Sequence, residues 1–198
     1  DNDHFGKVIW ARYASTGGPG HEYYRGNGFK TDFNLYAKAH YALTDQLTGY
    51  ADVQFRQVDY TVTGTDNDLN QLNVDTRMNF WNPKVGLHYA LSPNNTVYTS
   101  MSVGNREPNR NDFIDARTGT VPTHETMYDW EAGYKIQKSQ WTFNANFYWM
   151  NYKNQLVQTG EINDVGSSVR INVPKSNRIG IELENVWRFH KQWTWAAN

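Results

Sequence analysis

The chain contains no cysteine, so disulfides and thiol chemistry are absent from it. It has no run of about 18 apolar residues and a mean hydropathy of -0.79, which excludes a transmembrane helix. The net charge of -1 provides no basic excess for nucleic acid, and no nucleic-acid partner is expected. These absences leave membrane-spanning strands open, because alternating strands leave little trace in a hydropathy average.

Local motifs for catalysis or metal binding are missing as well. No nucleophile elbow, phosphate loop or dinucleotide fingerprint occurs, and the six histidines lack the spacing of a zinc site. The segment 66–70 resembles the start of a calcium loop. However, Gln71 and Arg77 stand where that loop needs Gly and Glu, so we expect a solvated acidic loop. The sequence predicts a protein that is not an enzyme and that holds no cofactor or metal.

Aromatic residues, in contrast, make up 15% of the chain, and apolar side chains occupy every second position over long segments. Successive side chains of a strand point to opposite faces, so a period of two predicts strands. We expect an all-β antiparallel meander of about nine strands, forming one domain over residues 1–198. One face of these strands carries no charged residue (the apolar face), and the other carries many (the polar face). The expected strands are 4–13, 31–43, 47–62, 81–91, 96–104, 128–138, 141–153, 177–190 and 193–198.

Short and long connections alternate along the chain. The short turns are rich in polar residues, and their starts are separated by 48, 46 and 53 residues. Short turns at one end and long loops at the other are typical of an outer-membrane β-barrel, with short periplasmic turns and long extracellular loops. The short turns lie at 44–46, 92–95, 138–140 and 191–192, and the long loops at about 14–30, 63–80, 105–127 and 154–176.

Three features favour a partial transmembrane β-barrel over a soluble sheet, which also has one dry and one wet face. Several expected strands have 11 to 16 residues, enough for a tilted membrane crossing with an overhang. The connections are long at one end only. Aromatic residues of the apolar face gather near the short turns and again near the loop ends, as at the two surfaces of a membrane. The alternative is a soluble antiparallel β-sheet binding module, which predicts that Trp149 and Trp187 are buried against protein.

Three passages resemble the barrel of TonB-dependent outer-membrane receptors. Residues 82–94 (NPKVGLHYALSPN) are similar to a strand and short turn that are common in these barrels. Residues 97–109 (VYTSMSVGNREPN) resemble the strand that follows, with Arg-Glu-Pro in the place of the family's Arg-Ala-Pro. Residues 124–135 (HETMYDWEAGYK) match a strand one loop later, and the order and spacing agree with the family.

The resemblance implies a fragment of a receptor barrel in a Gram-negative type of outer membrane, with the lipid bilayer as a partner. Such barrels have about 22 strands around a plugged lumen, so we expect the middle to late part of the wall, without the plug domain. The resemblance also implies active uptake of a scarce nutrient ligand, such as a metal-siderophore, a cobalamin or a glycan. The outer loops would bind it, and the TonB complex would act through the missing plug domain. A barrel enzyme is a further alternative, but the loops lack an obvious serine partner for His124.

Five residues are candidates for contact with a ligand or with the plug. Arg106, Glu107 and Arg110 lie in the densest polar segment, and each Arg can hold a carboxylate or phosphate through forked hydrogen bonds. The alternative is structural, with Arg and Glu in ion pairs of a wet barrel wall. Tyr23 and Tyr24, in the first expected loop, are candidates for stacking on a ligand, although aromatic residues also simply pack loops.

Overall fold

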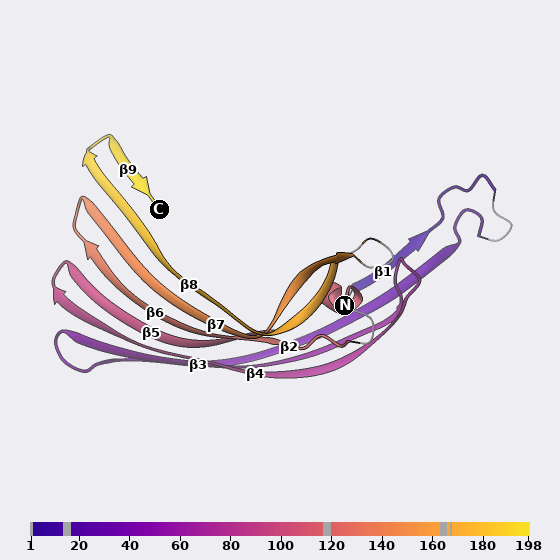
Figure 1. Ribbon diagram of the computed structural model, residues 1–198, viewed down its shortest axis with the longest axis horizontal. Coiled ribbons are helices and arrows are strands. Elements are labelled where there is room, and N and C mark those ends of the chain that lie inside the picture. The colour runs from indigo at the N-terminus through magenta and orange to yellow at the C-terminus, as the bar shows by residue number, and fades with distance from the viewer. Residues whose placement is uncertain (1, 14–16, 117–119, 163–165, 167) are drawn as a thin grey trace.

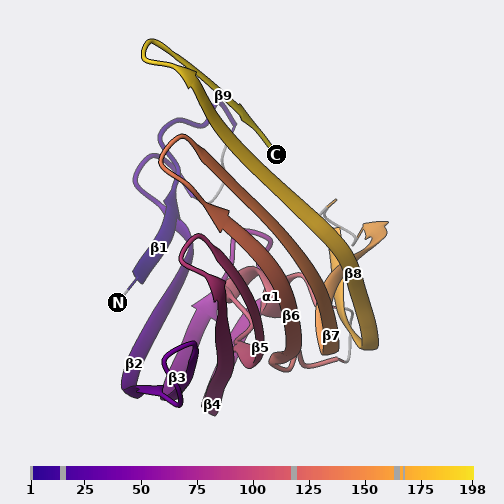
Figure 2. The same ribbon diagram turned by 90° about the vertical axis from the view of Figure 1, so that its left-hand side faces the viewer.

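Nine strands form one antiparallel sheet in the computed structural model, which describes all residues except 1, 14–16, 117–119, 163–165 and 167. Each strand is hydrogen-bonded to the next along the chain, so the expected all-β meander is confirmed. The sheet is strongly curved, and its first and last strands are not joined (Figures 1 and 2). The strands are β1 (Asn2–Lys7), β2 (Glu22–Ala42), β3 (Leu47–Thr65), β4 (Gln71–Ser92), β5 (Asn95–Arg106), β6 (Glu125–Gln137), β7 (Trp141–Ile162), β8 (Ser168–His190) and β9 (Trp193–Ala197).

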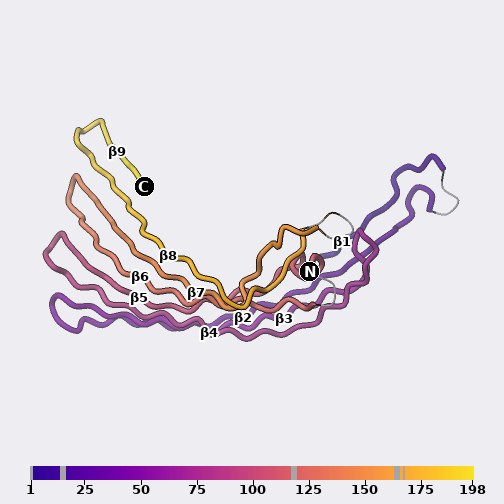
Figure 3. Tube along the Cα trace, viewed as in Figure 1, coloured from indigo at the N-terminus to yellow at the C-terminus, as the bar shows by residue number. Residues whose placement is uncertain are grey.

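The four tight turns fall where the sequence predicts them. They join β2 to β3, β4 to β5, β6 to β7 and β8 to β9, and Figure 3 shows all four at the left-hand end of the sheet. In the first turn, the Thr44 hydroxyl accepts a hydrogen bond from the Leu47 backbone N–H at 2.9 Å. In the second, Ser92 accepts one from the Asn95 side chain at 2.7 Å. Polar side chains thus close the turns that the strand alternation requires.

The hairpin of β3 and β4 extends much further than expected. The loop expected at 63–80 is mostly strand, and only residues 66–70 separate the two strands. Asp66 is fully buried there, and its carboxylate accepts hydrogen bonds from the backbone N–H of Asp68 at 2.9 Å and of Asn70 at 2.8 Å. The expected solvated acidic loop is therefore wrong, because Asp66 satisfies backbone donors inside a tight turn.

Three other strand boundaries differ from expectation in the same direction. β7 and β8 continue through most of the loop expected at 154–176, and β2 begins at Glu22, inside the loop expected at 14–30. The structure describes neither loop completely, since residues 14–16, 163–165 and 167 are outside the described part. These extensions lie beyond the apolar segments of the strands, so no apolar alternation marks them. β1, in contrast, ends at Lys7 instead of residue 13.

A long inner loop spans residues 107–124, and its described parts, 107–116 and 120–124, fold onto the polar face near the loop end of the sheet. It contains the helix α1 (Arg110–Ile114), which the sequence reasoning did not predict and which lies on the concave side in Figures 1 and 2. Beneath this region Val58, Val62 and Phe80 are at most 1% exposed. The ring of Phe80 meets His124 at 5.3 Å between centroids. Among the described residues, no helix is long and apolar enough to cross a membrane.

The apolar face of the sheet stays exposed. Leu35 and Ile181 are 65% and 68% exposed, and Trp149 and Trp187 are 44% and 50% exposed. The soluble-module alternative predicts that this face is buried against protein, and the exposure contradicts it. Some polar atoms on this face are satisfied within the sheet, as a surrounding without water favours. The indole N–H of Trp130, for example, donates to the Thr99 hydroxyl at 2.9 Å.

Three tyrosines of the polar face each lie over a glycine on the next strand. A Cβ on Gly133 would lie 2.3 Å from the ring of Tyr98, so no larger residue fits there without a shift. The hydroxyl of Tyr98 also donates to Asn146 at 3.0 Å, which reaches across a third strand. These contacts fix the register of the wall below the inner loop. The paired residues are Tyr50 and Gly86, Tyr98 and Gly133, and Tyr148 and Gly180.

Candidate functional site

The inner loop and the polar face of β2 and β3 enclose a pocket of about 350 Å³. The structure brings three of the five predicted site residues together here, namely Arg106, Glu107 and Arg110. The predicted sites Tyr23 and Tyr24 do not line this pocket. The remaining lining residues are Lys30, Tyr60, Pro108 and Asn109.

Glu107 binds the inner loop to the wall. One carboxylate oxygen accepts a hydrogen bond from Lys30 Nζ at 2.6 Å, and the other accepts one from Arg56 Nη1 at 2.8 Å. Arg56 also binds Asp32, so four charged groups from β2, β3 and the inner loop form one network. Burial raises the pKa of Glu107, but hydrogen bonds from Arg56 and Lys30 outweigh it and lower that pKa to about 2. Glu107 is therefore ionised and locked in place.

Arg106 is also committed to a structural ion pair. As the last residue of β5 it lies opposite Glu125 of β6, and its Nε lies 3.0 Å from a Glu125 carboxylate oxygen. The other oxygen of that carboxylate accepts a hydrogen bond from the Leu156 backbone N–H at 3.1 Å. The structural alternative for Arg106 and Glu107 thus describes their contacts, while a ligand contact for either remains a prediction.

A capping box holds α1 in its position. The Asn109 side chain accepts a hydrogen bond from the Asp112 backbone N–H at 3.0 Å, and the Asp112 carboxylate accepts one from the Asn109 backbone N–H at 2.8 Å. Asp112 is 2% exposed, and its other oxygen accepts a hydrogen bond from Arg170 of β8 at 3.0 Å. The sequence reasoning missed this anchor, although an Asn followed three residues later by Asp is a recognisable helix start.

A second clamp joins the inner loop to the β7–β8 hairpin. The Asn172 side chain donates to the Thr123 carbonyl at 2.9 Å and accepts from the Thr123 backbone N–H at 2.9 Å. The same amide donates to the Asn154 carbonyl at 2.7 Å. Contacts to β2, β3, β7 and β8 therefore shape the inner loop, so the pocket exists before any ligand arrives.

Arg110 differs from its neighbours because one of its nitrogens has no partner. Its Nη2 is buried and forms no hydrogen bond with any described residue. The nitrogen lies against β2, where a Cβ on Gly26 would be only 3.3 Å from it. Burial raises the pKa of Tyr60, and the positive charge of Arg110 opposes that rise. Arg110 thus supplies a partly buried cation to the pocket, and its Nη2 is an unused donor on the side that lies against β2.

Tyr23 and Tyr24 lie in β2 rather than in the first loop, which corrects the expected placement. Their rings contact each other with centroids 5.0 Å apart, and Tyr24 contacts His4 of β1 at 5.4 Å. Tyr23 is 48% exposed. They therefore pack the edge between β1 and β2, and their contact with a ligand remains a prediction.

The family described as "TonB dependent receptor-like, beta-barrel" matches residues 2–198. The chain belongs to this family. Its members are outer-membrane transport receptors rather than enzymes, so the expected class, location and absence of enzyme activity are confirmed. The chain forms part of the barrel domain. In outer-membrane barrels the apolar outward face of the wall is the one that meets lipid.

Several receptors share sequence or fold with this chain. The pesticin receptor of Yersinia enterocolitica is 27% identical over 111 residues, which cover 56% of this chain and 16% of that receptor. The alignment with a structure of the copper transporter OprC covers 84% of this chain and 28% of the OprC chain. Its TM-score is 0.71, and the two sequences are 11% identical. The alignment with the ferric yersiniabactin uptake receptor FyuA from Yersinia pestis covers 89% of this chain and 27% of the FyuA chain. Its TM-score is 0.63, and the two sequences are 21% identical. The structural likenesses show the barrel fold, and the chain spans well under a third of each protein.

Proposed function

We propose that the intact protein takes up an anionic metal chelate, such as a metal-siderophore, through the outer membrane. The observation that carries this proposal is Arg110, a cation that lines the pocket on the polar face and whose Nη2 has no hydrogen-bond partner among the described residues. A carboxylate or a deprotonated metal-binding oxygen in the pocket would match the charge of this guanidinium. A neutral glycan would leave the charge of Arg110 unmatched, so the pocket favours the chelate over the glycan.

The mechanism is binding and passage, without covalent chemistry. Glu107 and Asp32 together balance the charges of Lys30 and Arg56, so Arg110 is left to receive the ligand. Because the pocket is preformed, binding does not first require the inner loop to order. Release toward the periplasm would then draw on energy that the TonB complex transmits through a plug domain of the intact receptor.

Relatives support the ligand class. Fold relatives include receptors for ferric-catecholate and ferric yersiniabactin import. The sequence relative is named for pesticin, and a copper transporter shares the fold, so neither iron nor one chelate chemistry follows from the family alone. The cation in the pocket narrows the choice to ligands that present an anionic group.

The test is growth of a deletion strain that carries the full-length receptor, with purified ferric chelates as single iron sources. We expect Arg110→Gln to raise the chelate concentration for half-maximal growth about tenfold, since a charged hydrogen bond is lost. Arg12→Gln, at an exposed position away from the pocket, is the matched control. In parallel cultures, cobalamin or a glycan is supplied as the limiting nutrient. Receptor-dependent growth on cobalamin or on a glycan, but on no metal chelate, would refute the proposal.

A further inference from the structure

The sheet has an unpaired strand edge in its interior, between β4 and β5. β4 pairs with β3 along nearly its whole length, but its ladder with β5 begins only at Lys84. Asn105 of β5 extends the contact as far as Trp81, whose carbonyl accepts a hydrogen bond from the Asn105 side chain at 3.1 Å. In the part of the chain that the structure describes, the backbone of residues 71–79 forms hydrogen bonds only with β3.

The inner loop turns away from this edge. β5 ends at Arg106, and the next residue, Glu107, is bound to Lys30 and Arg56 on the polar face. β6 begins beside the end of β5, so neither strand reaches the level of residues 71–79. Figure 1 shows the β3–β4 hairpin continuing to the right beyond β5 and β6. The strand position next to residues 71–79 is therefore not filled by any described strand.

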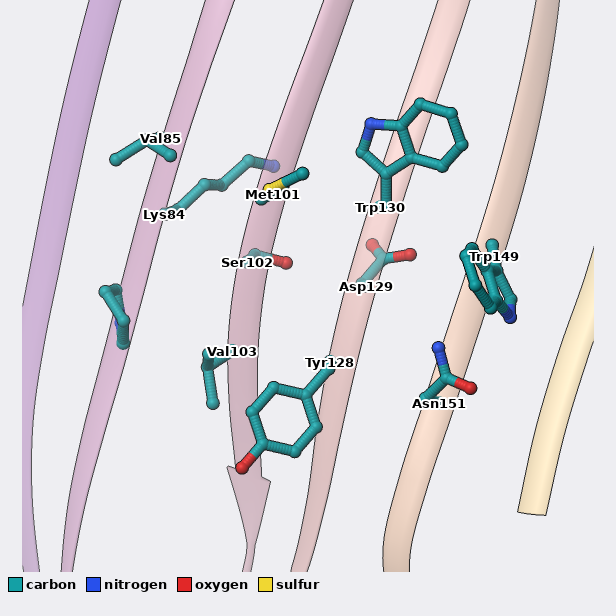
Figure 4. Close-up of a pocket in the computed structure, with 11 residues that line it drawn as sticks. Lys84, Val85, Met101, Ser102, Val103, Tyr128, Asp129, Trp130, Trp149 and Asn151 are labelled. Carbon is teal, nitrogen blue, oxygen red and sulfur yellow. The ribbon is translucent and has the colours of Figure 1, made fainter. Parts of the chain in front are cut away.

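The unpaired edge lies beyond the lipid-facing part of the wall. Figure 4 shows that part, where β4 to β7 lie side by side and Val85, Met101 and Trp130 border a hollow of about 580 Å³ on the apolar face. Trp81 is the last aromatic residue on this face of β4 before the edge begins. Aromatic side chains mark the membrane surface, so residues 71–79 lie in the water on the loop side.

The backbone groups of the edge follow from the alternation of the strand. The carbonyl of Trp81 points toward β5, so the odd-numbered residues of β4 direct their N–H and C=O groups to that side. Between residues 71 and 79 these groups form a row of about 26 Å. The odd-numbered side chains are exposed, whereas Leu72, Val74 and Met78 point to the polar face and are half-buried. An added strand therefore needs apolar side chains on the inner side and polar ones outside.

The edge of β4 lacks the features that normally protect a strand edge. Residues 71–79 contain no proline, no inward-pointing charge and no bulge in their register with β3. The edge of β7 that faces β6 differs, because Asn154 has a positive φ of 55° and the register with β8 shifts between Gln158 and Ile162. The β7 edge is thus bent and interrupted, while the β4 edge remains straight and available for pairing.

We propose that the edge of β4 binds an extended polypeptide segment from outside the cell as an added antiparallel strand. A strand satisfies both the N–H and the C=O groups of such an edge, and it continues the line of β5. Asp75 forms no ion pair with the described residues, and Arg77 is paired with Asp59 of β3 on one side only. The segment therefore carries a basic residue opposite Asp75, an acidic residue opposite Arg77 and apolar residues between them.

A second copy of the receptor does not fit this edge. Two receptors in one membrane direct their β4 strands the same way across the bilayer, so their edges cannot pair as antiparallel strands. The edge also lies outside the pocket around Arg110, which is lined by residues of the inner loop, β2 and β3. Binding of the segment is therefore independent of the chelate that we propose for that pocket.

The backbone pairing is tested on the full-length receptor in detergent, by fluorescence anisotropy of the labelled peptide Thr-Val-Glu-Val-Lys-Val-Thr-Val. In the antiparallel register its Glu lies opposite Arg77 and its Lys opposite Asp75. The N–H groups of these two peptide residues then face β4, and those of the valines face away. We expect N-methylation of the Glu and the Lys to weaken binding about tenfold. N-methylation of the two central valines is the matched control and should change binding less than about twofold.

The charges show whether the peptide binds at this edge. Asp75→Lys places a like charge opposite the Lys of the peptide and should weaken binding about fivefold. A peptide with Glu in place of that Lys should recover the loss. Asp45→Lys, in the turn at the opposite end of the sheet, is the matched control and should change neither affinity.

Three outcomes would overturn the proposal. They are no binding of the first peptide, an equal loss from the two sets of methyl groups, and an unchanged affinity in Asp75→Lys. Self-association of the receptor that the peptide reverses would assign the edge to a second copy instead, and would also overturn it.

Discussion

Glu107→Gln should release the inner loop from the barrel wall. The ion network around Lys30 and Arg56 moves the pKa of Glu107 from 4.5 to about 2. At about 1.4 kcal/mol per pKa unit, that difference corresponds to about 3 kcal/mol of stabilisation of the docked loop. The Glu107 side chain is only 14% exposed, so screening by water removes little of this value. The variant should therefore open the inner loop about 100-fold more often at neutral pH.

Hydrogen exchange on the full-length receptor measures this opening at the backbone amides of α1. Glu184→Gln, at an exposed position of β8, is the matched control. The pH dependence has a definite sign: because the docked-state pKa is depressed, the stabilisation is present above about pH 4.5 and disappears as the pH falls toward 2. Unchanged exchange in Glu107→Gln, or equal acceleration in the control, would show that the ion network does not hold the loop.

Three further variants test the wall and the inner loop. Gly133→Ala forces a Cβ against the Tyr98 ring and should lower the free energy of unfolding in urea by about 1–3 kcal/mol. Gly104→Ala is the control, because the nearest atom to its added Cβ is 3.7 Å away, and it should lower the free energy of unfolding much less. Phe80→Ala leaves a cavity under the inner loop and should destabilise the docked loop by about 3–5 kcal/mol. Protease should therefore cleave the inner loop of this variant while the strands stay resistant. Asp112→Ala removes one half of the capping box and the contact with Arg170, so α1 should exchange faster by about 1 kcal/mol or more, and unchanged exchange would contradict that role.

The sequence predicts the wall better than it predicts the site, for a physical reason. Lipid requires every outward side chain of the crossing segment to be uncharged, so alternation is strong there and the tight turns follow from it. Beyond the membrane that requirement ends, and the polar continuations of the hairpins are not recognised as strands. Val58, Val62 and Phe80 are apolar residues on the polar face, but they become a core only where described parts of the inner loop, such as Phe113 and His124, pack against this region. That contact joins distant segments, and neither periodicity nor a local motif describes it.

The size of the pocket limits how a ligand uses it. At about 350 Å³ it lies near the lower end of the range for small-molecule sites, so it suits one anionic arm better than a whole chelate. The arm must reach Arg110, because Lys30 and Arg56 are held by Glu107 and Asp32. Arg110→Lys keeps the charge but loses the fork, so it should bind a single-oxygen anion well and a two-oxygen carboxylate poorly. If uptake of carboxylate-bearing chelates falls as much in Arg110→Lys as in Arg110→Gln, forked recognition accounts for the affinity. If uptake by the Arg110→Lys variant equals that of the unaltered receptor, the positive charge alone accounts for the affinity.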